Sequence, residues 1–216
     1  MTLISKKKVL CALCLCAAAM PIIASADDDV KPKESGFEFG FGGGGSQLLM
    51  SPRIDGATTL GGGTYTVFAG YRFNQWAAAE ASYLDTGQVS SGIVGTGADA
   101  DTYYSFRTEP HIFTATGMGV VPITDSFSLF GRAGIAHIWY TANFTTTDLA
   151  VTGYPSQTTS FKETSNSLIW GGGMAYYFDR ARLRLEYDQT KTNPDFDGVT
   201  ADCKLRILTL TVAWVL

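Results

Sequence analysis

Charged side chains inside otherwise apolar stretches are the residues of this chain whose types and spacing could do chemistry. Two acids and two arginines interrupt segments of alternating residues: Glu80, Arg132, Arg184 and Glu186. Such groups must pair when they leave water, because an isolated buried charge is very costly. We therefore predict an interior ion-pair network among these four residues. A network of this kind can fill an interior or gate an ion path, and the residue types leave both roles open.

Three other patterns were weighed for metal or phosphate chemistry. Residues 193–198 match the first half of a calcium loop, but its twelfth position is Lys204 where Glu is required. A phosphate-binding glycine loop leads into a helix, but the glycine triplets at 43–45 and 61–63 do not precede one. A third triplet, at 171–173 inside an apolar stretch, indicates a strand that bends. We expect neither a metal site nor a cofactor.

Alternation of residue types with period two runs through most of the chain and predicts strands. The last stretch is the clearest, with Leu208, Leu210, Val212, Trp214 and Leu216 on one face and smaller residues on the other. Eight segments follow such a pattern: residues 36–45, 63–73, 76–84, 107–121, 126–140, 168–178, 181–189 and 205–216. The pattern does not decide which residues of the 107–121 segment share a face.

The connections between these segments alternate between long and short. Long, polar connections are expected at 46–62, 85–105, 142–167 and 190–202, and short turns at 74–75, 122–125 and 179–180. A strand sandwich has no reason to sort its loops in this way, whereas a membrane barrel has tight periplasmic turns and long outer loops. The sequence therefore predicts an all-β fold: an eight-stranded antiparallel up-and-down transmembrane β-barrel with both termini on the periplasmic side.

The distribution of charge decides which face of the strands points outward. A soluble barrel would carry lysines on its strand exteriors, but the lysines fall in predicted loops, in the N-terminal region or at the end of a strand. Mid-strand charges lie on the face opposite the aromatic residues. Each residue of a tilted strand rises about 2.5 Å along the barrel axis, so the four network residues lie roughly 10 to 18 Å above their turns. We therefore expect charges in the lumen and aromatic residues against lipid.

Aromatic residues gather near the predicted strand ends on the outward face. Such residues form girdles at the two membrane interfaces of outer-membrane barrels. The residues we assign to these girdles are Tyr71, Phe73, Trp139, Trp170 and Trp214.

The N-terminal region carries the features of a secretory signal. Lys6, Lys7 and Lys8 precede an apolar run at 9–23, and Ala24-Ser25-Ala26 forms a small-x-small cleavage site. We predict a cleaved signal peptide at 1–26, a periplasmic tail at 27–35 and the barrel at 36–216. Only Cys203 lies outside the signal, which excludes an internal disulfide. A formal net charge of −4 argues against nucleic acid as a partner.

Three patches resemble the small OmpA/OmpX-type outer-membrane barrels. They are residues 70–74 followed by 79–85, residues 122–131, and residues 183–187. The resemblance implies a Gram-negative outer-membrane protein of the porin-like barrel group, inserted by the assembly machinery through its C-terminal strand. It also implies charged pairs inside the barrel. The family usually ends in Phe, so Leu216 is a departure that shifts recognition toward Trp214 and the alternation.

Some eight-stranded barrels modify lipid A, so the two histidines were compared with such sites. The lipid A deacylases pair His and Ser two residues apart on a strand, but His111 is followed by Phe113 and His137 by Trp139. We expect no enzymatic activity. The predicted function is a structural role in the envelope, with surface loops for adhesion or contact with a host or the environment. The predicted partners are outer-membrane lipid, lipopolysaccharide and an extracellular ligand at the loops. The alternatives are a small pore or a lipid A-modifying enzyme.

Overall fold

The computed structural model describes residues 35–51, 60–94, 101–150, 156–178, 180–193, 195–196, 199–200 and 202–216. The predicted signal peptide (1–26) and almost all of the predicted tail (27–35) lie outside these ranges. Three residues of the candidate calcium loop at 193–198 also lie outside them. No helix among the described residues is long and apolar enough to cross a membrane.

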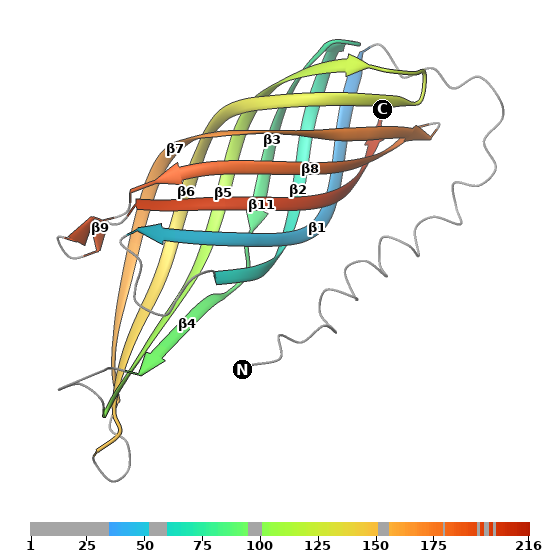
Figure 1. Ribbon diagram of the computed structural model, residues 1–216. Coiled ribbons are helices and arrows are strands. Elements are labelled where there is room, and N and C mark those ends of the chain that lie inside the picture. The colour runs from blue at the N-terminus through green and yellow to red at the C-terminus, as the bar shows by residue number, and fades with distance from the viewer. Residues whose placement is uncertain are drawn as a thin grey trace.

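Antiparallel strands close into a ring around one lumen (Figure 1). Neighbouring strands follow the order β3-β2-β1-β11-β8-β7-β6-β5, and β5 pairs back to β3. The eight-stranded up-and-down barrel is therefore confirmed. The wall strands are β1 (Gly36–Ser51), β2 (Leu60–Asn74), β3 (Ala77–Asp85), β5 (Thr102–Pro122), β6 (Phe127–Asp148), β7 (Ser156–Phe178), β8 (Ala181–Thr192) and β11 (Asp202–Val215).

Three short strands lie outside this ring. Strand β4 (Val89–Val94) pairs with residues 103–108 of β5, beyond the part of β5 that pairs with β3. It continues the line of β3 after a break at which Gly87 has a φ of 63°, a left-handed conformation that favours glycine. Strands β9 (Asp195–Phe196) and β10 (Val199–Thr200) pair only with each other.

Tight turns join the strands at the end of the barrel where the chain finishes. The Asn74 side chain accepts hydrogen bonds from the amides of Trp76 and Ala77, at 2.8 and 2.9 Å. Thr124 accepts one from the Phe127 amide at 3.0 Å. The amide of Leu216 donates to the carbonyl of Phe37 at 2.8 Å, so β1 and β11 close the ring at this end. This is the short-turn end that the sequence predicted.

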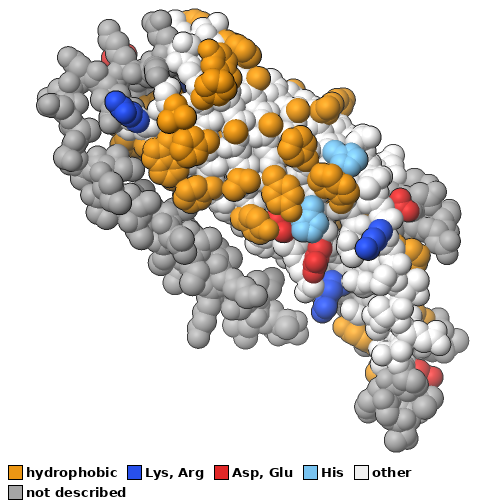
Figure 2. Space-filling view, turned by 180° about the vertical axis from the view of Figure 1, so that it is seen from behind, with side chains coloured by type: hydrophobic (Ala, Val, Ile, Leu, Met, Phe, Trp, Pro, Cys, Tyr) orange, Lys and Arg blue, Asp and Glu red, His pale blue; other side chains and the backbone are white. Residues whose placement is uncertain are grey.

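Burial alternates along each wall strand and settles the facing of β5, which the sequence left undecided. Ile112, Thr114, Thr116, Met118 and Val120 point into the lumen, and the residues between them face outward. The outward face of the whole wall is rich in exposed large apolar side chains, as Figure 2 shows for one side of the molecule. The arrangement matches an apolar exterior and a side-chain-filled interior.

The predicted loop boundaries were wrong on the outer side of the barrel. Residues 142–148 and 156–167 continue β6 and β7 as strands, and β4 and the start of β5 occupy part of the predicted loop at 85–105. Strands β4 to β7 together extend past the other strands as a protruding sheet (Figure 1). We call the part formed by residues 89–94, 102–108, 141–148 and 156–164 the arm. Lys162 therefore lies in a strand rather than in a loop, although beyond the apolar band.

Candidate functional site

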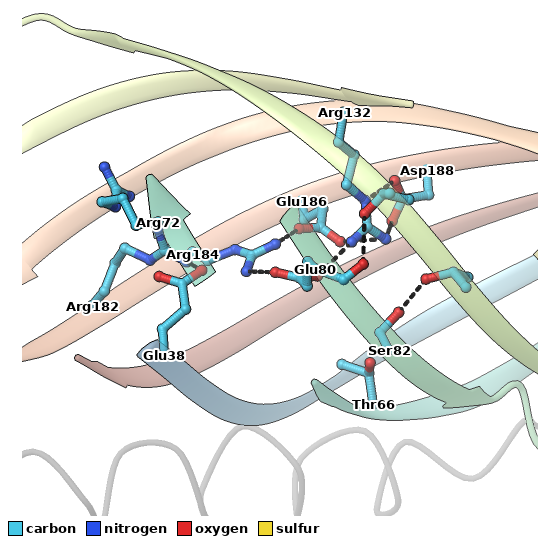
Figure 3. Close-up of polar contacts among 12 residues, drawn as sticks. Glu38, Thr66, Arg72, Glu80, Ser82, Arg132, Arg182, Arg184, Glu186 and Asp188 are labelled. Carbon is cyan, nitrogen blue, oxygen red and sulfur yellow. Dashed lines mark hydrogen bonds and ion pairs between the residues drawn. The ribbon is translucent and has the colours of Figure 1, made fainter. Parts of the chain in front are cut away.

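The structure brings the four predicted network residues together in the lumen (Figure 3). Arg132 lies 2.8 Å from Glu80 and 2.8 Å from Glu186, in each case between a guanidinium nitrogen and a carboxylate oxygen. Arg184 contacts the second oxygen of Glu80 at 2.5 Å and also pairs with Glu186. Each arginine thus bridges the same two acids, which come from β3 and β8.

Asp188 is a further member that the sequence reasoning did not place in the network. Its carboxylate receives two hydrogen bonds from Arg132, from Nε at 2.8 Å and from Nη2 at 2.7 Å. The sequence could have indicated this contact, because Asp188 is two residues from Glu186 and therefore lies on the same face of β8. The count of residues from the turn was misleading, because Asp188 comes two residues after Glu186 along β8 and was left out of the group at similar distances from the turns.

A second cluster lies nearer the periplasmic turns. Arg182 Nη2 donates to Glu38 Oε1 at 2.7 Å, and Arg72 Nη2 donates to the hydroxyl of Tyr177 at 2.7 Å. Both guanidinium groups also lie over the Tyr177 ring, at 5.9 and 5.5 Å from its centre. The sequence placed Glu38 and Arg182 on the charged face but did not predict that they pair.

The buried charges balance among the described residues. The buried acids are Glu38, Glu80, Glu186 and Asp188, and the buried arginines are Arg72, Arg132, Arg182 and Arg184. Aromatic rings add further contacts to this set: Arg184 lies 4.5 Å from the centre of the Phe68 ring and 5.0 Å from that of Phe130. A set with four charges of each sign limits the electrostatic cost of burying it.

Apolar layers lie above and below the central network formed by Glu80, Arg132, Arg184, Glu186 and Asp188. The periplasmic layer consists of Ala78, Met118, Val120, Phe130, Ala175 and Tyr177. The outer layer consists of Leu48, Leu84, Val89, Ile112, Ala136, Ile138, Tyr140, Ile169, Cys203, Leu205 and Ile207. Between them, hydroxyl groups surround the charges, as in the 2.6 Å contact of Ser82 with Thr114. The central network around Arg132 and Arg184 is therefore enclosed between packed apolar side chains. Arg72 and Arg182 instead lie beside the periplasmic layer, as ladder partners of Ala78 and Tyr177.

The predicted interfacial aromatics all lie on the outer face of the wall. Tyr71 and Phe73 are exposed close to the turn at 75–76, and Trp214 is near the chain end. Trp139 and Trp170 are also exposed, but both strands extend well past them. Trp170 pairs with Ala133 and Gln189 in the middle of the wall. Tyr71, Phe73 and Trp214 therefore lie near strand ends, whereas Trp139 and Trp170 do not.

Both histidines lie on the outer face, where the apolar wall meets polar residues. The Nδ1 atom of His111 lies 3.3 Å from Asp85 and 3.0 Å from the Tyr83 hydroxyl. A hydrolytic triad needs the acid and the hydroxyl at opposite ring nitrogens. Here both partners share one nitrogen, so this cluster is not arranged to pass a proton between them. His137 instead pairs with Asn166 at 2.6 Å. No group of three potential metal-ligating side chains is close enough to hold an ion in the part of the chain that the structure describes.

Among the residues that the structure describes, the first part of β7 has a ladder partner on one edge only. Residues 156–168 of β7 pair with β6, whereas pairing with β8 starts only at Ile169. The first part of this edge is exposed and polar, with the sequence Ser-Gln-Thr-Thr-Ser at 156–160. Unpaired backbone amides and carbonyls along such an edge can receive another strand.

A closed ring with an apolar exterior and a charged interior is the architecture of an outer-membrane barrel. The family described as "Outer membrane protein beta-barrel domain" matches the chain over residues 9–215. The chain belongs to this family. The protein is accordingly located in the outer membrane.

Solved outer-membrane barrels share the fold. Neisserial surface protein A is 12% identical, with a TM-score of 0.55, and the match covers 85% of this chain and 100% of that one. The outer membrane protein OprG from Pseudomonas aeruginosa is 11% identical, with a TM-score of 0.51, and the match covers 87% and 100%. No curated protein sequence matches the chain.

Proposed function

We propose that this outer-membrane barrel is a non-enzymatic surface protein that stabilises the envelope and binds an extracellular partner through the arm. The edge of β7 that has no described ladder partner at residues 156–166 is the observation that carries this proposal. At residues 167 and 168, the Thr190 hydroxyl of β8 already bonds to β7. An extended peptide added to such an edge gains main-chain hydrogen bonds without requiring a preformed pocket. Lys162 and Glu163 are the only charged residues along this edge, and it has no proline, whereas unused edges are commonly protected by charged residues or proline.

The two alternative functions fit the geometry less well. A pore needs a continuous wet path, but apolar residues pack above and below the lumen charges. A hydrolase needs a nucleophile aligned with a base, but the Tyr83 hydroxyl and Asp85 meet the same nitrogen of His111.

The remaining partners follow from the strand surfaces. Lipid, including lipopolysaccharide, would cover the exposed aromatic and aliphatic side chains of the wall. The assembly machinery would recognise β11, whose Trp214 stacks against Phe39 and Phe41 of the neighbouring strand, at ring-centre distances of 5.8 and 5.7 Å.

Trimming the arm tests the proposed binding role. Residues 143–160 are replaced by Asn-Gly, which joins Ala142 to its ladder partner Phe161 through a two-residue hairpin turn. A random peptide library displayed on phage is then selected on the detergent-solubilised barrel. We expect the intact barrel to select peptides rich in strand-forming residues and the trimmed barrel to select none of them.

The matched control keeps the edge and changes one side chain. Thr158→Val removes the 2.9 Å hydroxyl contact with Thr145 but leaves the β7 backbone in place. This variant should bind the selected peptides as the parent does. Equal selection by the trimmed and intact barrels would refute binding through residues 143–160 of the arm, provided that both insert into membranes.

A further inference from the structure

A groove of about 440 Å³ lies on the outer wall, where β5, β6 and β7 cross the border of the apolar band. Its main lining residues are Phe113, Ala115, Ile135, His137, Asn166 and Leu168. We call it the lateral groove. Its volume falls within the range of roughly 300–1,000 Å³ that is usual for ligand sites. Nothing in the proposed surface binding role uses this groove.

The polarity of the lateral groove changes along the barrel axis. Ala115, Ile135 and Leu168 form one ladder row, nearer the periplasmic side. Phe113, His137 and Asn166 form the next outward-facing ladder row toward the outer surface, and two of these three side chains are polar. Leu168 and Ile135 are 73% and 64% exposed, among the most exposed large apolar side chains described. The groove is thus apolar toward the membrane centre and polar toward the outer surface.

The polar end of the groove continues into a band of charged and hydrogen-bonding residues. Figure 2 shows histidine side chains at the edge of the hydrophobic surface, with acidic and basic side chains beyond them. The acids are already engaged: Asp85 accepts from Tyr65 at 2.7 Å, and Glu109 accepts from Gln88 at 2.8 Å. Lys162, which is exposed and lies one ladder row beyond Trp139 and Thr164, makes no ion pair with any described residue.

We propose that the lateral groove holds an acyl chain of a phosphate-bearing lipid of the outer leaflet, with the lipid headgroup against His137, Asn166 and Lys162. The apolar part of the groove lies at the depth of hydrocarbon, and the imidazole, amide and ammonium groups lie where a headgroup begins. A cationic side chain beside an acyl groove favours a lipid with phosphate over one with no net charge. The barrel therefore carries one preferred lipid rather than only a uniform annulus.

Native mass spectrometry of the mature barrel, released from mild detergent after incubation with monophosphoryl lipid A, tests this proposal. The parent should retain one lipid. Ala115→Trp fills the groove from an exposed position on the outer wall, and it should lower the retained fraction at least about tenfold. Ala69→Trp is the matched control, because Ala69 is also exposed, lies in the same ladder row two strands away and does not line the groove. It should retain lipid as the parent does.

A second variant tests the headgroup contact separately. Lys162→Glu, in the arm, should weaken retention of monophosphoryl lipid A and leave the weaker retention of phosphatidylcholine unchanged. Equal retention by Ala115→Trp and Ala69→Trp would overturn the groove as the site. Equal retention of the two lipids by the parent would overturn recognition of a net negative headgroup, because the phosphate of phosphatidylcholine is neutralised by its choline. A gel shift on heating verifies that each variant is a folded barrel.

Discussion

Arg132 in β6 and Asp188 in β8 reach each other over the intervening strand β7, and Gly171 is the residue that lies between them. Arg132 is the ladder partner of Gly171, and Gly171 is the ladder partner of Asp188. A Cβ atom at Gly171 would lie 2.2 Å from the Oδ1 atom of Asp188. The glycine therefore leaves the space through which the two-pronged bridge forms. The sequence interpretation, a strand that bends, gave only part of the reason for this residue.

Gly171→Ala should break this bridge. The new methyl group would lie 2.2 Å from the Asp188 carboxylate and 2.3 Å from the backbone carbonyl of Tyr187, so it would displace both. The buried charge left without its partner alone costs about 3–5 kcal/mol. Urea unfolding in phospholipid vesicles measures the loss. Gly117→Ala is the control, because a Cβ at Gly117 meets nothing within 4 Å. The control should equal the parent or gain up to about 1 kcal/mol, since glycine weakens a strand. Equal stability of Gly171→Ala and Gly117→Ala would contradict this role of the glycine.

Glu80→Ala should also lower the free energy of unfolding by about 3–5 kcal/mol, because Arg132 and Arg184 both lose a partner. The same urea titration detects the change. Glu109→Ala is the control: Glu109 is an acid of the outer rim that bonds Gln88 in an exposed position, and its loss should change stability by at most about 0.5 kcal/mol. A Glu80→Ala barrel as stable as the parent would remove the case for the network as a stabilising element.

The barrel should show no discrete ion conductance in a planar bilayer. The lumen charges pair with one another, and packed apolar layers separate them from both sides of the membrane. Replacing residues of the outer layer alone should not open a path, since the periplasmic layer stays closed. Single-channel steps from the pure parent barrel would show that the layers separate, and they would favour the pore instead.

The alternation of residue types with period two was sufficient to predict the strands that form the wall of the barrel. Where one face meets lipid and the other fills the lumen, residue types alternate strongly, so the existence of the strands could be predicted. Their facing could be predicted too, except in β5, whose alternation was left undecided. The arm lacks this contrast because its apolar residues, such as Tyr104, Phe106 and Phe144, are scattered among polar ones and form no long period-two run. Its threonines are nevertheless good strand formers. The segment at 142–167 was therefore predicted as a loop.

The charged site could be predicted only in part, for a related reason. Alternation places a side chain on the inner face, but it does not say which inner residues meet across the lumen. Heights counted from the turns grouped Glu80, Arg132, Arg184 and Glu186 correctly in space. They left out Asp188, whose contact with Arg132 depends on the length and direction of the guanidinium group and on the gap at Gly171.

Oxygen accessibility of spin labels along β5 tests the central claim most directly, namely that the apolar face of this barrel meets hydrocarbon while its interior is closed. Single cysteines at positions 112–121, in a Cys203→Ala background in lipid vesicles, carry the label. The structure predicts period-two accessibility, high at 113, 115, 117, 119 and 121 and low at the positions between them. The opposite phase, or no alternation, would contradict the account.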